Sequence, residues 1–195
     1  MKEQEYKYIA QTYTTTITVA DYMAGFRDKE RFLGYCKECH NYGKSWACPP
    51  FNFDVDVPLN RYKTALLIAI KILPERQDIP IAESGRLILP ERKSIQKRLL
   101  EMEQLYDGYS LAYAGSCIYC PTGSCARKQN HPCRHPELVR PSLEAFGFDI
   151  GLTTSKLFGI ELKWGKNGFV PEYLTLVSGF FHNSSEPLSF PLSTI

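Results

Sequence analysis

The spacing of apolar residues predicts three strands along the chain. Residues 8–19 are rich in Thr, Tyr and Ile, which are types that favour the extended backbone. Residues 64–73 form a nearly continuous apolar run of strand length, as is typical of a strand buried on both faces at the centre of a sheet. Residues 109–115 are apolar and aromatic, and they predict a third strand just before a cysteine.

Two helices are predicted between these strands. In residues 91–106 the apolar side chains recur at intervals of four, three and four, and polar side chains occupy the other face. Residues 20–32 show a similar apolar pattern, and this helix should end before Gly34. The basic residues of the longer helix are expected to form a solvated face: Arg92, Lys93, Lys97 and Arg98.

Prolines and glycines mark the connections. Residues 74–90 combine prolines with many charges, so we expect a loop across the surface there. Pro136 and Pro141 suit the first positions of two short helices, and Gly147 suits a helix stop.

The order of the elements predicts an α/β fold, with α+β as the alternative class. Residues 64–115 follow the order strand, helix, strand, which is typical of a crossover between two parallel strands. Residues 159–164 and 173–181 resemble the strands of a closing hairpin. We expect one metal-binding domain, residues 1–195, with a short mixed sheet, flanking helices and two cysteine-rich loops at residues 36–50 and 117–135.

Composition and charge narrow the function classes. The chain has 195 residues, of which 44% are hydrophobic, as in ordinary globular proteins. Its 23 basic and 21 acidic side chains give a net charge of +2, so binding of nucleic acid or of a membrane surface gains little support. The longest apolar run is far shorter than the ~20 residues that cross a bilayer. The charged N-terminal residues do not resemble a secretory signal, so we expect a cytoplasmic protein.

The seven cysteines fall into two tight groups. The first comprises Cys36, Cys39 and Cys48, and the second comprises Cys117, Cys120, Cys125 and Cys133. An odd number cannot pair completely within the chain, and a disulfide scaffold needs an oxidising compartment. Each group begins with C-x2-C, a spacing that turns two sulfur atoms toward one point. All seven cysteines are therefore candidate metal ligands.

The second group favours an iron-sulfur cluster. It spaces four thiols singly along the chain, whereas zinc sites commonly pair two short C-x2-C clamps across a longer spacer. We therefore expect a 4Fe-4S cluster on Cys117, Cys120, Cys125 and Cys133 that passes electrons to an unknown redox partner protein. The spacing differs from the bacterial ferredoxin run C-x2-C-x2-C-x3-C-P. The alternative is a zinc-stabilised interaction module.

The first group supplies only three thiols, which leaves several alternatives open. They could hold a cubane with one open iron, could recruit His40 or another side chain to complete a zinc site, or could belong to a shared site. Two separate sites are favoured. An open metal position is typical of catalytic sites, so any chemistry is expected near Cys36, Cys39 and Cys48. If a fourth ligand closes the site, the metal only stabilises a loop.

Side chains near the cysteines add further candidates. His40 and His135 each lie close to a cysteine in the sequence, and they could be ligands or could hydrogen-bond to ligands. His131 is a weaker candidate for either role. Nearby cations would offset the negative charge of a cluster, and four surround the second group: Arg127, Lys128, Arg134 and Arg140. The aromatic residues of the first group are expected to pack the loop: Tyr42, Trp46 and Phe51.

Two segments of this sequence resemble a prokaryotic family of predicted metal-binding proteins of unknown function. They are CKECHNYGKSWACPPF at residues 36–51 and CIYCPTGSCARKQNHPCRHPELVRPSLEAFGFDI at residues 117–150. The matching positions are Tyr42, Gly43, Cys48, Pro49, Pro50, Cys133, Arg134, Pro136, Arg140, Pro141, Ser142, Glu144, Ala145 and Gly147. The resemblance implies metal binding by the cysteines and says nothing of a substrate.

Overall fold

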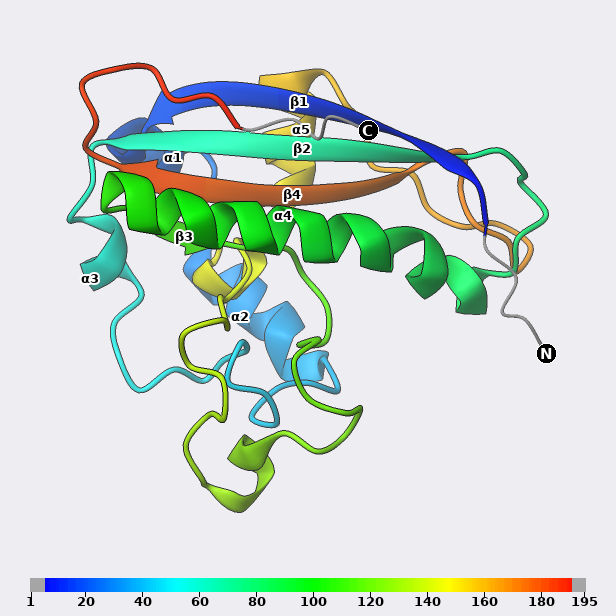
Figure 1. Ribbon diagram of the computed structural model, residues 1–195, viewed down its shortest axis with the longest axis horizontal. Helices are drawn as coiled ribbons and strands as arrows, with labels where there is room; N and C mark the ends of the chain where they lie inside the picture. The colour runs from blue at the N-terminus through cyan, green and yellow to red at the C-terminus, as the bar shows by residue number, and fades with distance from the viewer. Residues whose placement is uncertain (1–5, 191–195) are drawn as a thin grey trace.

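The protein is built on a four-stranded sheet in a computed structural model, of which residues 6–190 are described. The strands are β1 (Tyr8–Thr18), β2 (Thr64–Pro74), β3 (Tyr109–Leu111) and β4 (Leu174–His182). Their order is β1-β2-β4-β3, and every neighbouring pair is antiparallel. Figure 1 shows the three long strands stacked side by side, with the short β3 at one edge. The expected α/β class, a sheet with several helices, is confirmed.

The central strand β2 organises the core, as its continuous apolar sequence predicts. It pairs with β1 along its whole length and with β4 on its other side. Its alternate residues point to two separate apolar clusters, one containing Leu66 and Ile68 and the other containing Ala65 and Leu67. Burial of both faces explains why the run lacks the polar alternation of a half-exposed strand.

Helices cover both faces of the sheet. The long helix α4 (Ser84–Tyr106) packs on one face through Ile95, Leu99 and Met102, which share a cluster with alternate residues of β2. On the other face, α1 (Val19–Gly25) and α5 (Ile150–Phe158) join the second cluster. The remaining helical elements are α2 (Lys29–Glu38), α3 (Asp56–Leu59), η1 (Ile81–Glu83), η2 (Ala126–Gln129) and η3 (Glu144–Phe146).

The strand connections differ from the expected crossover and hairpin. β2 and β3 run in the same direction but do not pair, because β4 from the end of the chain lies between them. Residues 159–164 form no strand, and β4 pairs with β2 and β3 instead. Sequence spacing favoured the local hairpin, but a third apolar strand buries more surface in the middle of the sheet.

Several helix boundaries also differ from the predicted ones. The segment expected as one helix over residues 20–32 is divided into α1 and α2 by a break at which Asp28 accepts a hydrogen bond from the Arg31 N–H and caps α2. α2 continues past Gly34. α4 begins within the expected loop, so Pro90 lies inside it. No helix begins at Pro136 or Pro141, whereas Gly147 does end η3, with φ +90°.

The two cysteine loops, residues 36–50 and 117–135, project together from one side of the sheet, and we call them the cysteine lobe. Figure 1 shows α2 descending from the sheet into this lobe and the chain after β3 reaching its far end. Across residues 6–190, no helix is both long enough and apolar enough to cross a lipid bilayer. The lobe is thus the main part of the protein that lies outside the layers of sheet and helices.

A glycine at the end of α4 provides a test of how tightly the helix packs on the sheet. A Cβ atom on Gly108 would lie 2.1 Å from Cζ of Phe180, whose ring is fully buried and cannot move aside. We expect Gly108→Ala to lower the free energy of unfolding by about 1–3 kcal/mol, as overpacking does. Chemical denaturation measures the change.

A glycine inside α4 serves as the control. A Cβ atom on Gly85, within α4, would meet nothing within 4 Å. Gly85→Ala should therefore raise the free energy of unfolding by roughly 0.5–1 kcal/mol through helix propensity. Equal effects of the two substitutions would contradict the close packing of Gly108 on Phe180.

Candidate metal centre

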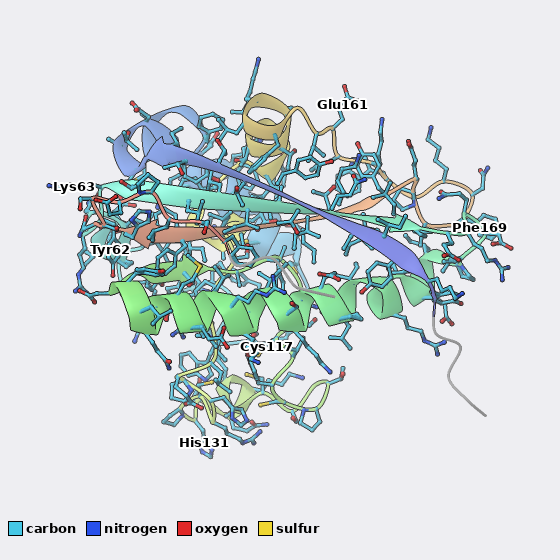
Figure 2. The ribbon with its side chains drawn as sticks, turned by 45° about the horizontal axis from the view of Figure 1, so that its top comes forward. Tyr62, Lys63, Cys117, His131, Glu161 and Phe169 are labelled. Atoms are coloured by element: carbon cyan, nitrogen blue, oxygen red, sulfur yellow. The ribbon has the colours of Figure 1, made fainter. Side chains whose placement is uncertain are left out.

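The four cysteines of the second group line one cavity. The chain leaves β3 and turns into the loop at Cys117, and Cys120, Cys125 and Cys133 follow around a space of about 190 Å³. All seven cysteines of the protein are free thiols. In Figure 2, Cys117 lies close to α4, where the loop begins, and His131 lies at the far end of the lobe. The fold therefore brings these four side chains to the wall of one cavity.

Hydrogen bonds are directed at sulfur atoms of this group. The backbone N–H of His135 lies 3.4 Å from Sγ of Cys133, and the backbone N–H of Tyr119 also donates to Cys117. The guanidinium of Arg134 approaches Sγ of Cys120 at 4.0 Å. Such donors stabilise negative charge on sulfur, which is the form in which cysteine binds a metal.

Electrostatic effects show that the four thiols are close to one another. Burial raises the pKa of Cys117, and negative charge on Cys120, Cys133 or Cys125 raises it further. The hydrogen bond from Tyr119 opposes this shift. A bound cation would oppose this shift at Cys117, because a metal ligates the deprotonated thiol.

The first group lies at the end of α2 and in the loop that follows. Cys36 is in the last turn of α2, and the N–H of Cys39 donates to the Cys36 carbonyl oxygen at 3.1 Å. The helix thus runs through the first C-x2-C pair instead of stopping before it. Cys48 completes the trio, and all three side chains line a second cavity of about 270 Å³.

The thiols of the first group also influence one another. Burial raises the pKa of Cys48 to about 11, and negative charge on Cys39 or Cys36 adds to this shift, against a hydrogen bond from Ser45. Burial also raises the pKa of Cys36, followed in size by the effect of Cys39. These effects group Cys36 with Cys39 and Cys48, and they group Cys117 with the second set.

Contacts between distant segments hold the two loops together. The guanidinium of Arg127, in η2, donates to the backbone carbonyl oxygen of Ser45 at 2.7 Å and also to those of Cys48 and Pro50. It lies 4.9 Å from the centre of the Trp46 ring, and the Trp46 indole N–H donates to the His131 carbonyl oxygen at 3.0 Å. The second cysteine loop therefore fixes the shape of the first.

The two cavities are neighbours. His40, Asn41, Ser116 and Cys117 contribute to the walls of both, and the Asn41 amide donates to the Ser116 hydroxyl at 3.2 Å. The expectation of two separate sites stays a prediction, but the fold places any two sites side by side. A change of charge at one site would therefore change the electrostatic potential at the other.

The possible ligand side chains are spaced more widely than in a closed site for a single ion. Within residues 6–190, no three His, Cys, Asp or Glu side chains lie close enough to hold a single metal ion. A tetrahedral zinc site with Zn–S bonds of ~2.3 Å needs sulfur atoms only ~3.8 Å apart. The second group instead surrounds a cavity of about 190 Å³, several times the ~30 Å³ that one water molecule occupies in the liquid.

The side chains expected to support the cysteines have different roles. Of the four cations, Arg134 and Lys128 face the second group, whereas Arg127 ties the loops and Arg140 pairs with Glu103. His40 lines both cavities, and His135 lines the second. Trp46 packs against Arg127, as expected of a packing residue.

Two residues beside the first group carry no functional prediction from the sequence. Glu144 lines the cavity of the trio with a buried carboxyl oxygen, although it lies within the Arg-Pro-Ser-x-Glu-Ala motif. Arg92 was expected on the solvated face of its helix; it is only partly exposed, and its guanidinium lies over the Tyr113 ring and lines the same cavity. In the sequence, the only available signal is the side of the helix on which Arg92 lies relative to the segment that follows β3.

Comparison with known proteins yields one family. The family model described as "Predicted metal-binding protein (DUF2284)" matches residues 24–179, which include both cysteine groups. No curated protein and no solved structure matches the chain. The matched range covers β2, β3, the first part of β4 and the whole cysteine lobe.

Proposed function

The chain belongs to the DUF2284 family of predicted metal-binding proteins, and from this premise we propose that it is a cytoplasmic iron-sulfur protein that transfers electrons. Its 4Fe-4S cluster is held by Cys117, Cys120, Cys125 and Cys133. The observation that carries the proposal is the convergence of these four thiols on one cavity with N–H donors directed at their sulfur atoms. Seven free thiols suit a reducing compartment.

The choice of a cluster over zinc rests on the spacing of the donors. Four thiols spaced singly around one cavity are suited to several irons bridged by sulfide. The hydrogen bonds to Cys117 and Cys133 are also typical of cluster sites, where donors to sulfur adjust the reduction potential.

When bound, such a cluster supplies the reversible uptake of one electron. The chain's own residues then stabilise the more negative reduced state: Arg134 lies beside Cys120, and Lys128 faces the same cavity. The lobe projects from the body, so a redox partner protein can approach it directly. The partner remains an expectation of the proposed role.

The first group is proposed to hold a second metal with an open position. Cys36, Cys39 and Cys48 supply three thiols, and the space beside them is larger than the one in the second group. An open position lets an added ligand reach the metal. Cyanide should therefore perturb the spectrum of one metal only, and Cys48→Ser should abolish that perturbation.

Metal analysis of two cysteine variants tests the proposed function. The wild-type protein, purified without oxygen, should be brown and contain iron and sulfide. Cys125→Ser should lose about four irons per chain, because a cubane needs all its cysteine ligands for stable binding. Cys48→Ser should keep those irons, since it lies outside the four-cysteine group. Iron and sulfide assays and electron paramagnetic resonance measure the cluster content of both variants.

The control is Ser124→Ala, which changes the neighbour of Cys125. Its hydroxyl donates to the Pro121 carbonyl oxygen at 2.8 Å, so the substitution perturbs the same loop without removing a thiol. It should keep the iron of the wild type. A colourless protein with stoichiometric zinc, whose chain unfolds on chelation, would instead support the zinc-stabilised module and overturn the cluster.

A further inference from the structure

The cavity beside Cys36, Cys39 and Cys48 has the features of a binding site for a small molecule. Its volume is about 270 Å³, and its walls come from the first cysteine loop, from α4 and from the segment that follows β3. Small or apolar side chains such as Ala47, Ala112 and Val139 form much of the lining. A cavity of ~150 Å³ is enough to hold benzene, so this space accepts an organic molecule of about a dozen non-hydrogen atoms.

Arg92 brings a positive charge to this cavity and is not paired with a carboxylate. In residues 6–190 no acidic side chain forms an ion pair with Arg92, and its Nε–H is buried without a hydrogen-bond partner. One Nη donates to the Ser116 carbonyl oxygen at 2.6 Å. A buried guanidinium donor without a partner is unfavourable, and an anionic ligand would satisfy it.

The surroundings of Arg92 hold its guanidinium in place. It lies 4.4 Å from the centre of the Tyr113 ring, and the Tyr113 hydroxyl donates to Gln96 at 2.8 Å. Gln96 in turn donates to the Leu138 carbonyl oxygen. Gly115, with φ +116°, passes so close that a Cβ atom there would lie 3.4 Å from the guanidinium. The donor is thus positioned before any ligand arrives, which lowers the entropy lost on binding.

A second polar group faces the same space. The Oε2 atom of Glu144 is buried and has no hydrogen-bond partner within the described chain. Burial raises the pKa of this carboxyl, against hydrogen bonds from its own backbone and from Ser142. The unpartnered oxygen is a second polar atom that a ligand would meet in this cavity.

We propose that this cavity binds a small organic carboxylate, with its carboxylate group on Arg92 and its apolar body against the alanine and valine walls. The single unbalanced cation favours a monoanion. Arg140 also reaches the cavity, but Glu103 neutralises it at 2.5 Å, so a phosphate dianion would lack its second positive partner. A neutral molecule would leave the Arg92 charge uncompensated.

The position of the cavity connects it with the metal site. This connection rests on the proposed function, whereas the binding of the ligand does not. A carboxylate bound at Arg92 would lie in the space onto which the open position of the cysteine trio faces. The ligand would then be the molecule that reacts at, or reports to, that metal. The binding itself depends on Arg92 and the cavity walls, whichever metal the cysteines hold.

Calorimetric titration of the metal-loaded protein tests the proposal. The probes are benzoate and hexanoate, with benzyl alcohol as the neutral analogue and inorganic phosphate as the dianion. The two carboxylates should bind more tightly than benzyl alcohol or phosphate. Arg92→Met should weaken benzoate binding by about 10- to 100-fold, the effect of losing one hydrogen bond to a charged group, and should leave benzyl alcohol unaffected.

Lys93→Met is the matched control, because it removes one positive charge from the neighbouring, exposed position of α4. It should leave the Kd for benzoate within twofold. If Arg92→Met does not fold, Arg92→Lys takes its place. It keeps the positive charge without the Nε–H, and it should weaken benzoate binding by a smaller factor. Absence of benzoate binding, tighter binding of phosphate, or an unchanged Kd in Arg92→Met would each overturn the proposal.

The iron content separates this result from the proposed function. Protein that contains iron and sulfide but binds neither carboxylate would retain the cluster and reject the ligand site. Protein that contains only zinc but binds benzoate through Arg92 would reject the cluster and retain the ligand site. An Arg92→Met variant that changes the reduction potential alone would assign Arg92 to charge balance at the metal.

Discussion

Glu103→Ala is expected to lower the free energy of unfolding by about 3 kcal/mol, because it leaves the Arg140 charge without its partner. Glu103 lies on α4, and both of its carboxylate oxygens receive donors from Arg140, at 2.8 and 2.5 Å. The side chains are only 14% and 17% exposed. Removal of one partner of a pair this deeply placed costs far more than loss of a surface pair.

The position of Glu103 explains why the effect should extend beyond one ion pair. The same carboxylate accepts the backbone N–H of Ser110 in β3 at 2.9 Å, and Arg140 belongs to the segment that returns from the cysteine lobe. Glu103 therefore joins the long helix, the edge strand and the base of the lobe. Its loss should expose β3 and the lobe base first, which hydrogen exchange would detect as faster exchange there.

Glu101→Ala on the same helix is the control for Glu103→Ala. Glu101 faces solvent and pairs with Lys97 at 3.8 Å, so its removal should change stability by less than about 0.5 kcal/mol. A loss of ~3 kcal/mol corresponds to a decrease of roughly 6–12 °C in Tm for a chain of this length. Equal Tm values for the two variants would show that the Glu103–Arg140 pair contributes nothing beyond surface charge.

The central strand and the long helix were predictable because their sequence pattern reflects their burial directly. β2 is buried on both faces and reads as an unbroken apolar run, whereas α4 is buried on one side and shows helical spacing. The order of the strands was not predictable in the same way. The insertion of β4 between β2 and β3 depends on contacts between segments more than 60 residues apart.

The candidate metal ligands were evident from residue type and spacing, but the support around them was not. Thiols at C-x2-C spacing indicate metal binding in any fold. The direction of a cation, in contrast, depends on what packs beside it. Arg127, Arg134 and Arg140 look equivalent in the sequence, yet they contact backbone carbonyls, a cysteine sulfur and a carboxylate respectively. Only the folded chain distinguishes these roles.

Arg127→Met should separate the two cysteine loops and lower the stability of the folded lobe by about 3 kcal/mol. Arg127 is the one side chain from the second loop that hydrogen-bonds three backbone carbonyl oxygens in the described part of the first loop. Each hydrogen bond to a charged group contributes ~1.5–3 kcal/mol, and the effects of three such bonds from one side chain are not additive. The stacking on Trp46 is lost as well.

Loss of this contact should affect the first cysteine group more than the second. The carbonyl groups of Ser45, Cys48 and Pro50 fix the turn that directs Cys48 toward Cys36 and Cys39. The second group keeps its own N–H donors, from His135 to Cys133 and from Tyr119 to Cys117. The variant should therefore release metal from the first group sooner on dilution into a chelator.

Arg127→Lys and Gln129→Ala are the comparisons that decide the cause. Lysine keeps the positive charge but cannot reach three carbonyl oxygens at once, so Arg127→Lys should show most of the loss. Gln129→Ala alters an exposed residue of the same short helix, η2, and should release metal at the wild-type rate. Wild-type release from Arg127→Lys would mean that charge near the cysteines, and not the bridge between the loops, retains the metal.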